Sequence, residues 1–200
     1  SEAWREYRDD IKTVVIKDGV TSIGSFAFEY CHSLKSISIP NSVTMIGDDV
    51  FYSCTSLASI TIPDSVTSIG WEVFINTAYY NNKSNWENGA LYIDNWLIAV
   101  DNDSEGEFTI KAGTKSIGGS AFRDCALLTS INIPNSLTSI GYNAFKNCSS
   151  LKSIAIPDSV TSIGWNAFYH CTSLASITIP DSVTSIGKYA FDGCSSLASI

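Results

Sequence analysis

Apolar and polar positions alternate along this chain in a pattern that returns at a nearly constant interval. In the stretch Ser33–Pro40, Leu34, Ile37 and Ile39 are apolar, and the residues between them are polar. The last two apolar positions have the period of a short β-strand, and all three follow the L-x-x-L-x-L arrangement of stacked repeats. We therefore predict short strands that pair in parallel from one repeat to the next, about 4.8 Å apart.

The rest of each repeat is predicted from its turn-forming residues. Pro40 lacks a backbone donor and ends the strand. A second extended run follows, and Gly47 is expected to form a corner with a positive φ. After this corner, the stretch Asp48–Ser56 is predicted to be a short helical or 3₁₀ segment that packs Phe51 and Cys54 inward.

The corner glycine and the phenylalanine four residues after it occur together seven times, mostly at an interval of 23 residues. A unit of this size cannot bury its own apolar face, so neighbouring units must bury it for each other, as in a solenoid. The phenylalanines should then stack into a column in which each ring buries roughly 150–250 Å². The glycines are Gly24, Gly47, Gly70, Gly118, Gly141, Gly164 and Gly187, and the phenylalanines are Phe28, Phe51, Phe74, Phe122, Phe145, Phe168 and Phe191.

The whole chain, residues 1–200, is interpreted as one solenoid domain with two departures from the repeat. Residues 1–12 do not fit the pattern, and we predict that they cap the exposed edge of the first unit. Residues 71–109 form an atypical repeat, because the interval between Ile62 and Ile110 is 48 residues, or two periods plus two.

A β-hairpin is predicted inside the atypical repeat. Leu91–Ile93 and Trp96–Val100 are apolar runs separated by two turn residues. One hairpin strand should continue the main ladder, and the pattern leaves open which one. The chain stops at Ile200 in the middle of a unit, so we expect a fragment of a longer protein.

Six cysteines occupy one column of the repeat. A zinc site needs ligands that converge from paired spacings, whereas these residues form a line along the stack. Parallel Cβ vectors in a ladder suit a disulfide poorly. We expect six free, mostly buried thiols and no metal. The column is Cys31, Cys54, Cys125, Cys148, Cys171 and Cys194.

Other candidate chemistry does not predict catalysis or a cofactor. His32 and His170 occupy different registers, and no Ser or Cys lies in a nucleophile elbow. Asp64, Asp158 and Asp181 form a column, but Ca²⁺ prefers six to eight oxygens, and Asx turns explain these residues without it. The net charge of −8 argues against nucleic acid and anionic membranes as partners. No apolar run reaches the roughly 18 residues that cross a bilayer, so we expect no direct membrane insertion.

The repeat unit resembles a known family. Ile156–Ile177 reads Ile-Pro-Asp-Ser-Val-Thr-Ser-Ile-Gly-Trp-Asn-Ala-Phe and continues through Cys171 to Ile177. It is similar to the BspA-like class of leucine-rich repeats, and the likeness covers most of residues 11–200. The resemblance implies an α/β repeat, a leucine-rich repeat solenoid with one parallel ladder of short strands. It also implies a bacterial surface or secreted protein that adheres to host or other proteins. Thr77 departs from the unit where Cys is expected, and Lys17 and Lys111 depart where Pro is expected.

Two surfaces are candidates for binding. The outward strand positions form a polar stripe, here called the strand face, which is either a solvated β face with cross-strand hydroxyl bonds or a ligand surface. The variable positions after each Gly and Phe carry aromatic residues, which are typical of interface anchors but could equally cover the Phe column. The strand face comprises Thr13, Ser36, Ser38, Ser59, Thr61, Ser130, Asn132, Ser153, Ser176 and Thr178; the aromatic candidates are Tyr142, Trp165, Tyr169, Trp71 and Tyr52.

We predict a non-enzymatic, extracellular or surface-displayed module that binds a host or extracellular matrix protein. Tyr142 and Trp165 share a register, and Tyr169 should point to the same side one helical turn later, so these three are the favoured anchors. A carbohydrate-binding module is the alternative, because Trp71, Trp86, Trp96 and Trp165 are available to bind a glycan. A structural spacer for another domain is the third possibility.

Overall fold

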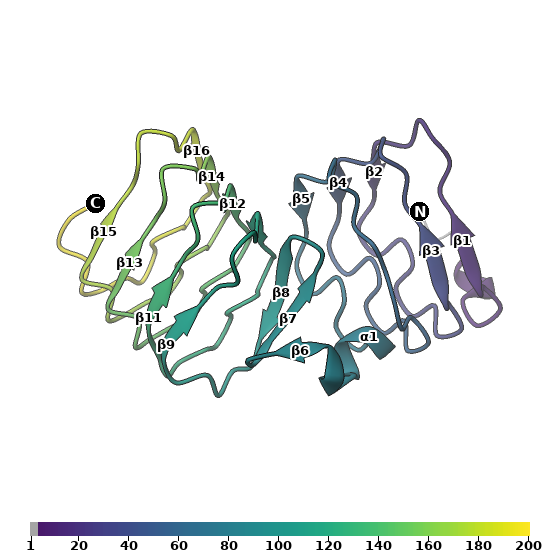
Figure 1. Ribbon diagram of the computed structural model, residues 1–200, viewed down its shortest axis with the longest axis horizontal. Coiled ribbons are helices and arrows are strands. Elements are labelled where there is room, and N and C mark those ends of the chain that lie inside the picture. Colours follow the sequence, from purple (N-terminus) through teal and green to yellow (C-terminus); the bar gives the residue numbers. More distant parts are fainter. Residues whose placement is uncertain (1–3) are drawn as a thin grey trace. The chain divides into compact units, whose positions relative to one another are not determined.

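The computed structural model describes residues 4–200 and contains two compact units, one that ends at Glu87 and one that spans Asn88–Ile200. Each unit is a β-solenoid in which successive turns stack through parallel strands (Figure 1). The predicted repeat solenoid is therefore confirmed.

The elements of the first unit are η1 (Arg5–Tyr7), β1 (Thr13–Val15), β2 (Ser22–Ile23), β3 (Ser36–Ser38), β4 (Met45–Ile46), β5 (Ser68–Ile69), α1 (Ala78–Asn81), η2 (Lys83–Asn85) and β6 (Trp86–Glu87). β1 pairs with β3 in one parallel ladder, and β2, β4 and β5 form a second. The second ladder is the extended run predicted after each proline. Each regular turn thus contributes to two ladders, where the sequence predicts one.

The elements of the second unit are β7 (Ala90–Ile93), β8 (Trp96–Val100), β9 (Gly106–Thr109), β10 (Ser116–Ile117), β11 (Leu128–Asn132), β12 (Ser139–Ile140), β13 (Ser153–Ala155), β14 (Ser162–Ile163), β15 (Ser176–Thr178) and β16 (Ser185–Ile186). β7 and β8 form the predicted antiparallel hairpin. β8 also pairs in parallel with β10, which begins the series β10, β12, β14 and β16. The second hairpin strand is therefore the one that continues a ladder.

The residues after each corner glycine do not form the predicted helical or 3₁₀ segment. We call the seven residues that follow this glycine the turn segment; in the second repeat it is residues 48–54, which are turns that end at Cys54. Asp49 and Ser53 have φ values of 52° and 57°, and a right-handed helix needs a negative φ at every residue. The expectation of a helical segment is wrong for this reason.

Backbone hydrogen bonds between repeats replace those of a helix. Asp49 N, Phe51 N and Ser53 N donate to carbonyl oxygens of the next turn segment, over distances of 3.0, 3.0 and 2.8 Å. The same three donors recur in the turn segments that begin at residues 25, 119, 142 and 165. The turn segments are thus held in register with one another by backbone hydrogen bonds, as the strands are.

The corner glycines are required by close packing, and the predicted positive φ is wrong for all seven. A Cβ added to Gly164 would lie 2.5 Å from the carbonyl carbon of Gly141, and one added to Gly47 would lie 2.5 Å from Ser25 N. At Gly24, in the first turn, an added Cβ meets nothing within 4 Å. Each later glycine therefore lets its turn approach the preceding turn.

The predicted Phe column is confirmed in both units. In the second unit, Phe145 and Phe168 are fully buried, and their rings stack at 5.2 Å with an interplanar angle of 2°. In the first, Phe28 and Phe51 stack at 5.9 Å. Since each ring packs on the next, the column forms the centre of each unit's core.

The cysteine column lies beside the Phe column. Five of the six free thiols are buried, as predicted, and Cys194 is half-buried. The thiols of Cys54, Cys148, Cys171 and Cys194 each donate to a phenylalanine carbonyl oxygen of the preceding repeat at 3.1 Å. Burial raises the pKa of the Cys54 thiol to about 12, which makes it a poor nucleophile.

Candidate functional site

The strand face is solvent-exposed, as predicted, except at Ser130, which is half-buried. Ser36 Oγ donates to Thr13 Oγ1 at 3.4 Å, and Asn132 Nδ2 donates to Thr109 Oγ1 at 3.3 Å. Such bonds between neighbouring strands are those expected of a solvated β face. They leave fewer polar groups of this face available to a ligand.

The aromatic candidates all lie on turn segments. Trp165 is 54% exposed and is the most exposed of the five, whereas the others are half-buried. Trp71, Tyr142 and Trp165 directly follow corner glycines, and Tyr52 and Tyr169 directly follow residues of the Phe column. Their place on the turn segments puts them at the surface beside the buried Phe rings.

The structure does not join Tyr142, Trp165 and Tyr169 through ring contacts within residues 4–200. Tyr169 was expected beside Trp165 on a helical turn, but the turn segment has left-handed residues at Asn166 and His170 instead. Tyr142 Oη accepts a bond from Asn166 Nδ2 at 3.3 Å. The helical argument is therefore wrong, and the role of these residues in binding stays a prediction.

Cationic side chains of the same unit cover two of these rings. Lys188 Nζ lies 5.7 Å from the Trp165 ring, and Lys146 Nζ lies 5.3 Å from the Tyr169 ring. The Tyr169 ring also stacks on the imidazole of His170 at 4.2 Å. A partner at this surface would meet aromatic rings with positive charges beside them.

The turn segments of the first unit are acidic, in contrast to the positive charges beside Trp165 and Tyr169 in the second unit. They contain four carboxylates and no basic residue: Glu29, Asp48, Asp49 and Glu72. Asp49 is only 5% exposed, and its carboxylate oxygens are not among the enclosed side-chain atoms that lack a hydrogen-bond partner in the described part of the chain. Burial, and next the charges of Glu72, Glu29 and Asp48, raise the pKa of Asp49 to about 6. The sequence pattern missed this site, although the absence of Lys and Arg from these segments is a signal that could have found it.

Exposed aromatic side chains accompany these carboxylates. Phe26 and Tyr30 are 50% and 39% exposed, although both have left-handed backbones with φ values of 63° and 59°. The Tyr30 ring meets the edge of Tyr52 at 5.6 Å. Phe26 N donates to Asp48 O at 2.8 Å, so aromatic and acidic residues of neighbouring turn segments lie side by side.

The tryptophans proposed for glycan binding are covered at two of four positions. Trp96 is buried in strand β8. Lys83 Nζ lies 3.9 Å from the Trp86 ring, and Tyr80 meets that ring at 5.3 Å with an interplanar angle of 81°. Glycan stacking requires an open ring face, which the buried Trp96 lacks and which Lys83 occupies at Trp86; the carbohydrate-binding alternative stays a prediction.

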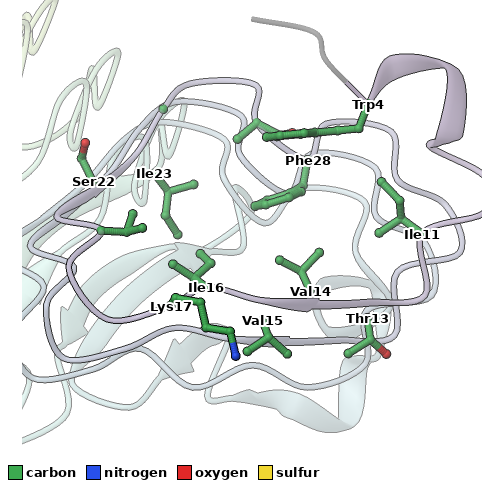
Figure 2. Close-up of a pocket in the computed structure, with 13 residues that line it drawn as sticks. Trp4, Ile11, Thr13, Val14, Val15, Ile16, Lys17, Ser22, Ile23 and Phe28 are labelled. Carbon is green, nitrogen blue, oxygen red and sulfur yellow. The ribbon is translucent and has the colours of Figure 1, made fainter.

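A cavity of about 610 Å³ lies at the β1 end of the first unit. Figure 2 shows Val14 and Ile16 directed toward Phe28, while the ring of Trp4 lies over Phe28. The two rings stack at 5.6 Å, and Trp4 Nε1 donates to Ala27 O. Trp4 thus extends the Phe column by one ring. The assignment of residues 1–12 as a cap stays a prediction, and residues 1–3 lie outside the described residues.

Candidate metal and catalytic groups are not brought together. Within residues 4–200, no group of three or more His, Cys, Asp or Glu side chains is placed to hold a metal ion. His32 Nδ1 lies 3.0 Å from Asp9 Oδ1 at the surface, and His170 stacks on Tyr169. In the same part of the chain, none of the helices has the length and apolar character of a membrane span.

Comparison with known proteins identifies the repeat. The model of the BspA type leucine rich repeat region matches residues 3–97 and 101–200 in six copies. The chain therefore belongs to the BspA-type leucine-rich repeat family, as the residue pattern indicated.

Several solved structures are similar to the chain. A leucine-rich repeat protein from Eubacterium ventriosum is 26% identical with a TM-score of 0.56, over 98% of this chain and 68% of that one. A leucine rich cell surface protein from Faecalibacterium prausnitzii is 32% identical with a TM-score of 0.46, and this chain, matched over 100% of its length, spans 62% of that one. The pneumococcal vaccine antigen PcpA is 20% identical with a TM-score of 0.42, over 90% of this chain and 55% of that one. No curated protein matches the sequence.

Proposed function

We propose that this chain is a non-enzymatic protein-binding module of a bacterial surface or secreted protein. The observation that carries the proposal is the exposed Trp165 on an otherwise uniform scaffold. The equivalent position holds Gly119, Tyr142 and Lys188 in the neighbouring repeats. A large aromatic side chain left 54% exposed is typical of an interface anchor, because it loses much apolar surface to water when a partner covers it.

A protein partner suits this surface better than a glycan does. Tyr142, Trp165 and Tyr169 combine aromatic area with polar tips, and Lys146 and Lys188 add charge at the ring faces. The strand face is the weaker candidate, because water matches its short hydroxyl groups nearly as well as a partner would. Membership of the BspA-type family is consistent with display at a cell surface or secretion, which we include in the proposal.

The test uses the whole chain against a panel of purified extracellular matrix proteins, with binding measured by surface plasmon resonance. The triple variant Tyr142→Ser, Trp165→Ser, Tyr169→Ser should lose capture, with a melting temperature close to that of the wild type. The matched control changes Ser153, Ser176 and Thr178 of the strand face to Ala and should keep capture.

Three results would count against this assignment. Capture that survives the triple variant but is lost in the control would move the site to the strand face. A signal on a glycan array without any protein capture would favour the carbohydrate-binding alternative. No binding in either assay would favour a spacer.

A further inference from the structure

We infer that the free edge of strand β1 binds an extended segment of a partner protein, which pairs with β1 as an added strand. The segment carries apolar side chains at alternate positions, for the cavity beside β1, and a carboxylate for Lys17. This site, here called the β1 edge, consists of Thr13, Val15 and Lys17 and the cavity that they line. It is separate from the aromatic candidates of the second unit, so the inference does not depend on the proposed function.

The first argument is the backbone of β1. Within residues 4–200, β1 pairs with β3 alone, and Ile16 N donates to Ser38 O of β3 at 3.0 Å. Backbone groups alternate in direction along a strand, so Thr13, Val15 and Lys17 direct theirs away from β3. A strand edge of this kind is a template on which another strand can form.

The second argument is that the first repeat has Lys17 where other repeats have a proline. A proline removes the N–H from this edge of the strand, whereas Lys17 retains it. Lys111 also replaces the proline, and there the retained N–H donates to Tyr92 Oη at 3.1 Å. A lysine at this position thus supplies a donor, and that of Lys17 points to the free edge. The prolines are Pro40, Pro63, Pro134, Pro157 and Pro180.

The third argument is the cavity of about 610 Å³ that the β1 edge lines. Val14 and Ile16 are half-buried and point toward Phe28 (Figure 2). Val20, which also lines the cavity, is 40% exposed, while its counterpart Val43 in the next repeat is fully buried. A strand with apolar side chains at alternate positions would cover these residues while its backbone bonds to β1.

The occupant is a single strand and not another whole repeat, because residues of this chain already cover part of the first turn. The Trp4 ring stacks on Phe28 at 5.6 Å, where a preceding repeat would place its own phenylalanine. Arg8 Nη2 lies 3.8 Å from Glu29 Oε2 beside it. A stacked repeat of a second copy would meet the same obstruction, whereas the β1 edge accepts one strand.

The charge at the cavity favours an acidic segment. Lys17 is charged, and the other residues that line the cavity are uncharged. A carboxylate at the matching position of the added strand would pair with this ammonium group. A free amphiphile could fill the cavity, but it would leave the backbone donors of β1 without acceptors. A peptide strand satisfies both the backbone and the cavity.

The test measures binding of a fluorescein-labelled peptide, Gly-Ser-Ile-Thr-Ile-Glu-Gly, to the whole chain by fluorescence anisotropy. Its isoleucines match the inward positions of Val14 and Ile16, and its glutamate matches Lys17. Lys17→Pro introduces the residue that other repeats hold, and it should weaken binding about tenfold because a backbone donor and a charge are lost. Lys17→Gln keeps the donor and should weaken binding only about twofold.

Amide hydrogen exchange, followed by NMR, gives a second readout that needs no variant. The amides of Thr13, Val15 and Lys17 should exchange rapidly in the free chain and become protected when the peptide binds. The amide of Ile16 already bonds to Ser38 O and should be protected in both states.

Four results would overturn the inference. They are equal binding by the wild type and Lys17→Pro, no binding by the wild type, equal losses in Lys17→Pro and Lys17→Gln, and protection of the Val15 amide before peptide is added. Equal affinity for the reordered peptide Gly-Ser-Thr-Ile-Ile-Glu-Gly would also contradict it, because that peptide lacks the alternation. A wild-type dimer that Lys17→Pro dissociates would make a second copy the occupant in place of a partner. The triple variant of the proposed function should keep peptide binding, so the two sites can fail separately.

Discussion

The turn segments of the two units share one backbone and differ in charge. In the first unit they carry four carboxylates and no basic residue, while in the second they carry Arg123, Lys146 and Lys188 against Asp124 and Asp192. Both sets hold left-handed residues at the same two positions and donate the same inter-turn bonds. The repeat thus determines the backbone, and the variable positions on it set the local electrostatics.

This contrast indicates two different kinds of surface on one scaffold. In the second unit, Lys146 lies near the Tyr169 ring and Lys188 lies near the Trp165 ring. The turn segments of this unit therefore contain both the aromatic rings and the cations beside them. In the first unit, the cation beside a ring comes from outside the turn segments: Arg8 lies 5.7 Å from the Tyr30 ring and 3.8 Å from Glu29 Oε2. The two faces should therefore select partners of different charge.

The largest expected effect tests whether the two units share an equivalent core. Phe51→Ala and Phe145→Ala each remove a fully buried ring from a stacked column and leave a cavity. Both should lower the free energy of unfolding by about 3–5 kcal/mol in chemical denaturation. Unchanged stability in either variant would show that its Phe column is not buried in solution, and the equivalence of the units would fail.

A smaller effect tests the close approach of neighbouring turns. Gly164→Ala places a Cβ 2.5 Å from the carbonyl carbon of Gly141, so the turns must move apart, which should cost about 1–3 kcal/mol. Gly24→Ala meets nothing within 4 Å and should change stability by less than about 0.5 kcal/mol. Thermal unfolding followed by circular dichroism measures both. Equal losses would mean that the glycines are needed for backbone conformation, as the sequence alone suggested.

Much of the fold was predictable because the repeat makes each column visible several times. The Phe column, the buried thiols and the hairpin all follow from the alignment of repeats. Two departures from the repeat also have local causes that only the structure reveals. Thr77 Oγ1 accepts a bond from Tyr80 N and caps helix α1, and Lys111 supplies an N–H to Tyr92 Oη that a proline would lack.

The turn segments were predicted less well, for physical reasons. Asn and Asp at positions such as Asn143 and Asn147 favour a left-handed backbone and were a usable signal. The equivalent positions of the first repeat hold Phe26 and Tyr30, which are also left-handed, so the Asn or Asp signal is absent there. The acidic cluster on the first unit's turn segments depends on which side chains stacking brings together, because Asp49 and Glu72 lie 23 residues apart in the sequence. A pattern within one repeat does not show that contact.

The central claim is that burial and the neighbouring carboxylates of the first unit's turn segments raise the pKa of Asp49, and the pH dependence of its contribution to stability tests this most directly. Its pKa is raised from 3.8 to about 6 in the folded chain, so between these values the folded state keeps a proton that the unfolded state has lost. The free energy of unfolding should therefore fall as pH rises from about 4 to about 6, and Asp49→Asn should remove that fall. The charges of Glu29, Asp48 and Glu72 also act on the Asp49 carboxylate, and Arg8 is paired with Glu29. All four of these residues are unchanged in the Asp49→Asn variant.

The measurement is urea denaturation of the wild type and Asp49→Asn at pH 4, 5, 6 and 7.5. The advantage of the variant should grow between pH 4 and pH 7, as Asp49 loses its proton in the folded state, and stay constant above about pH 7. A difference that does not change with pH, or a wild type that gains stability relative to the variant as pH rises, would show that Asp49 is solvated or paired, and would contradict the account.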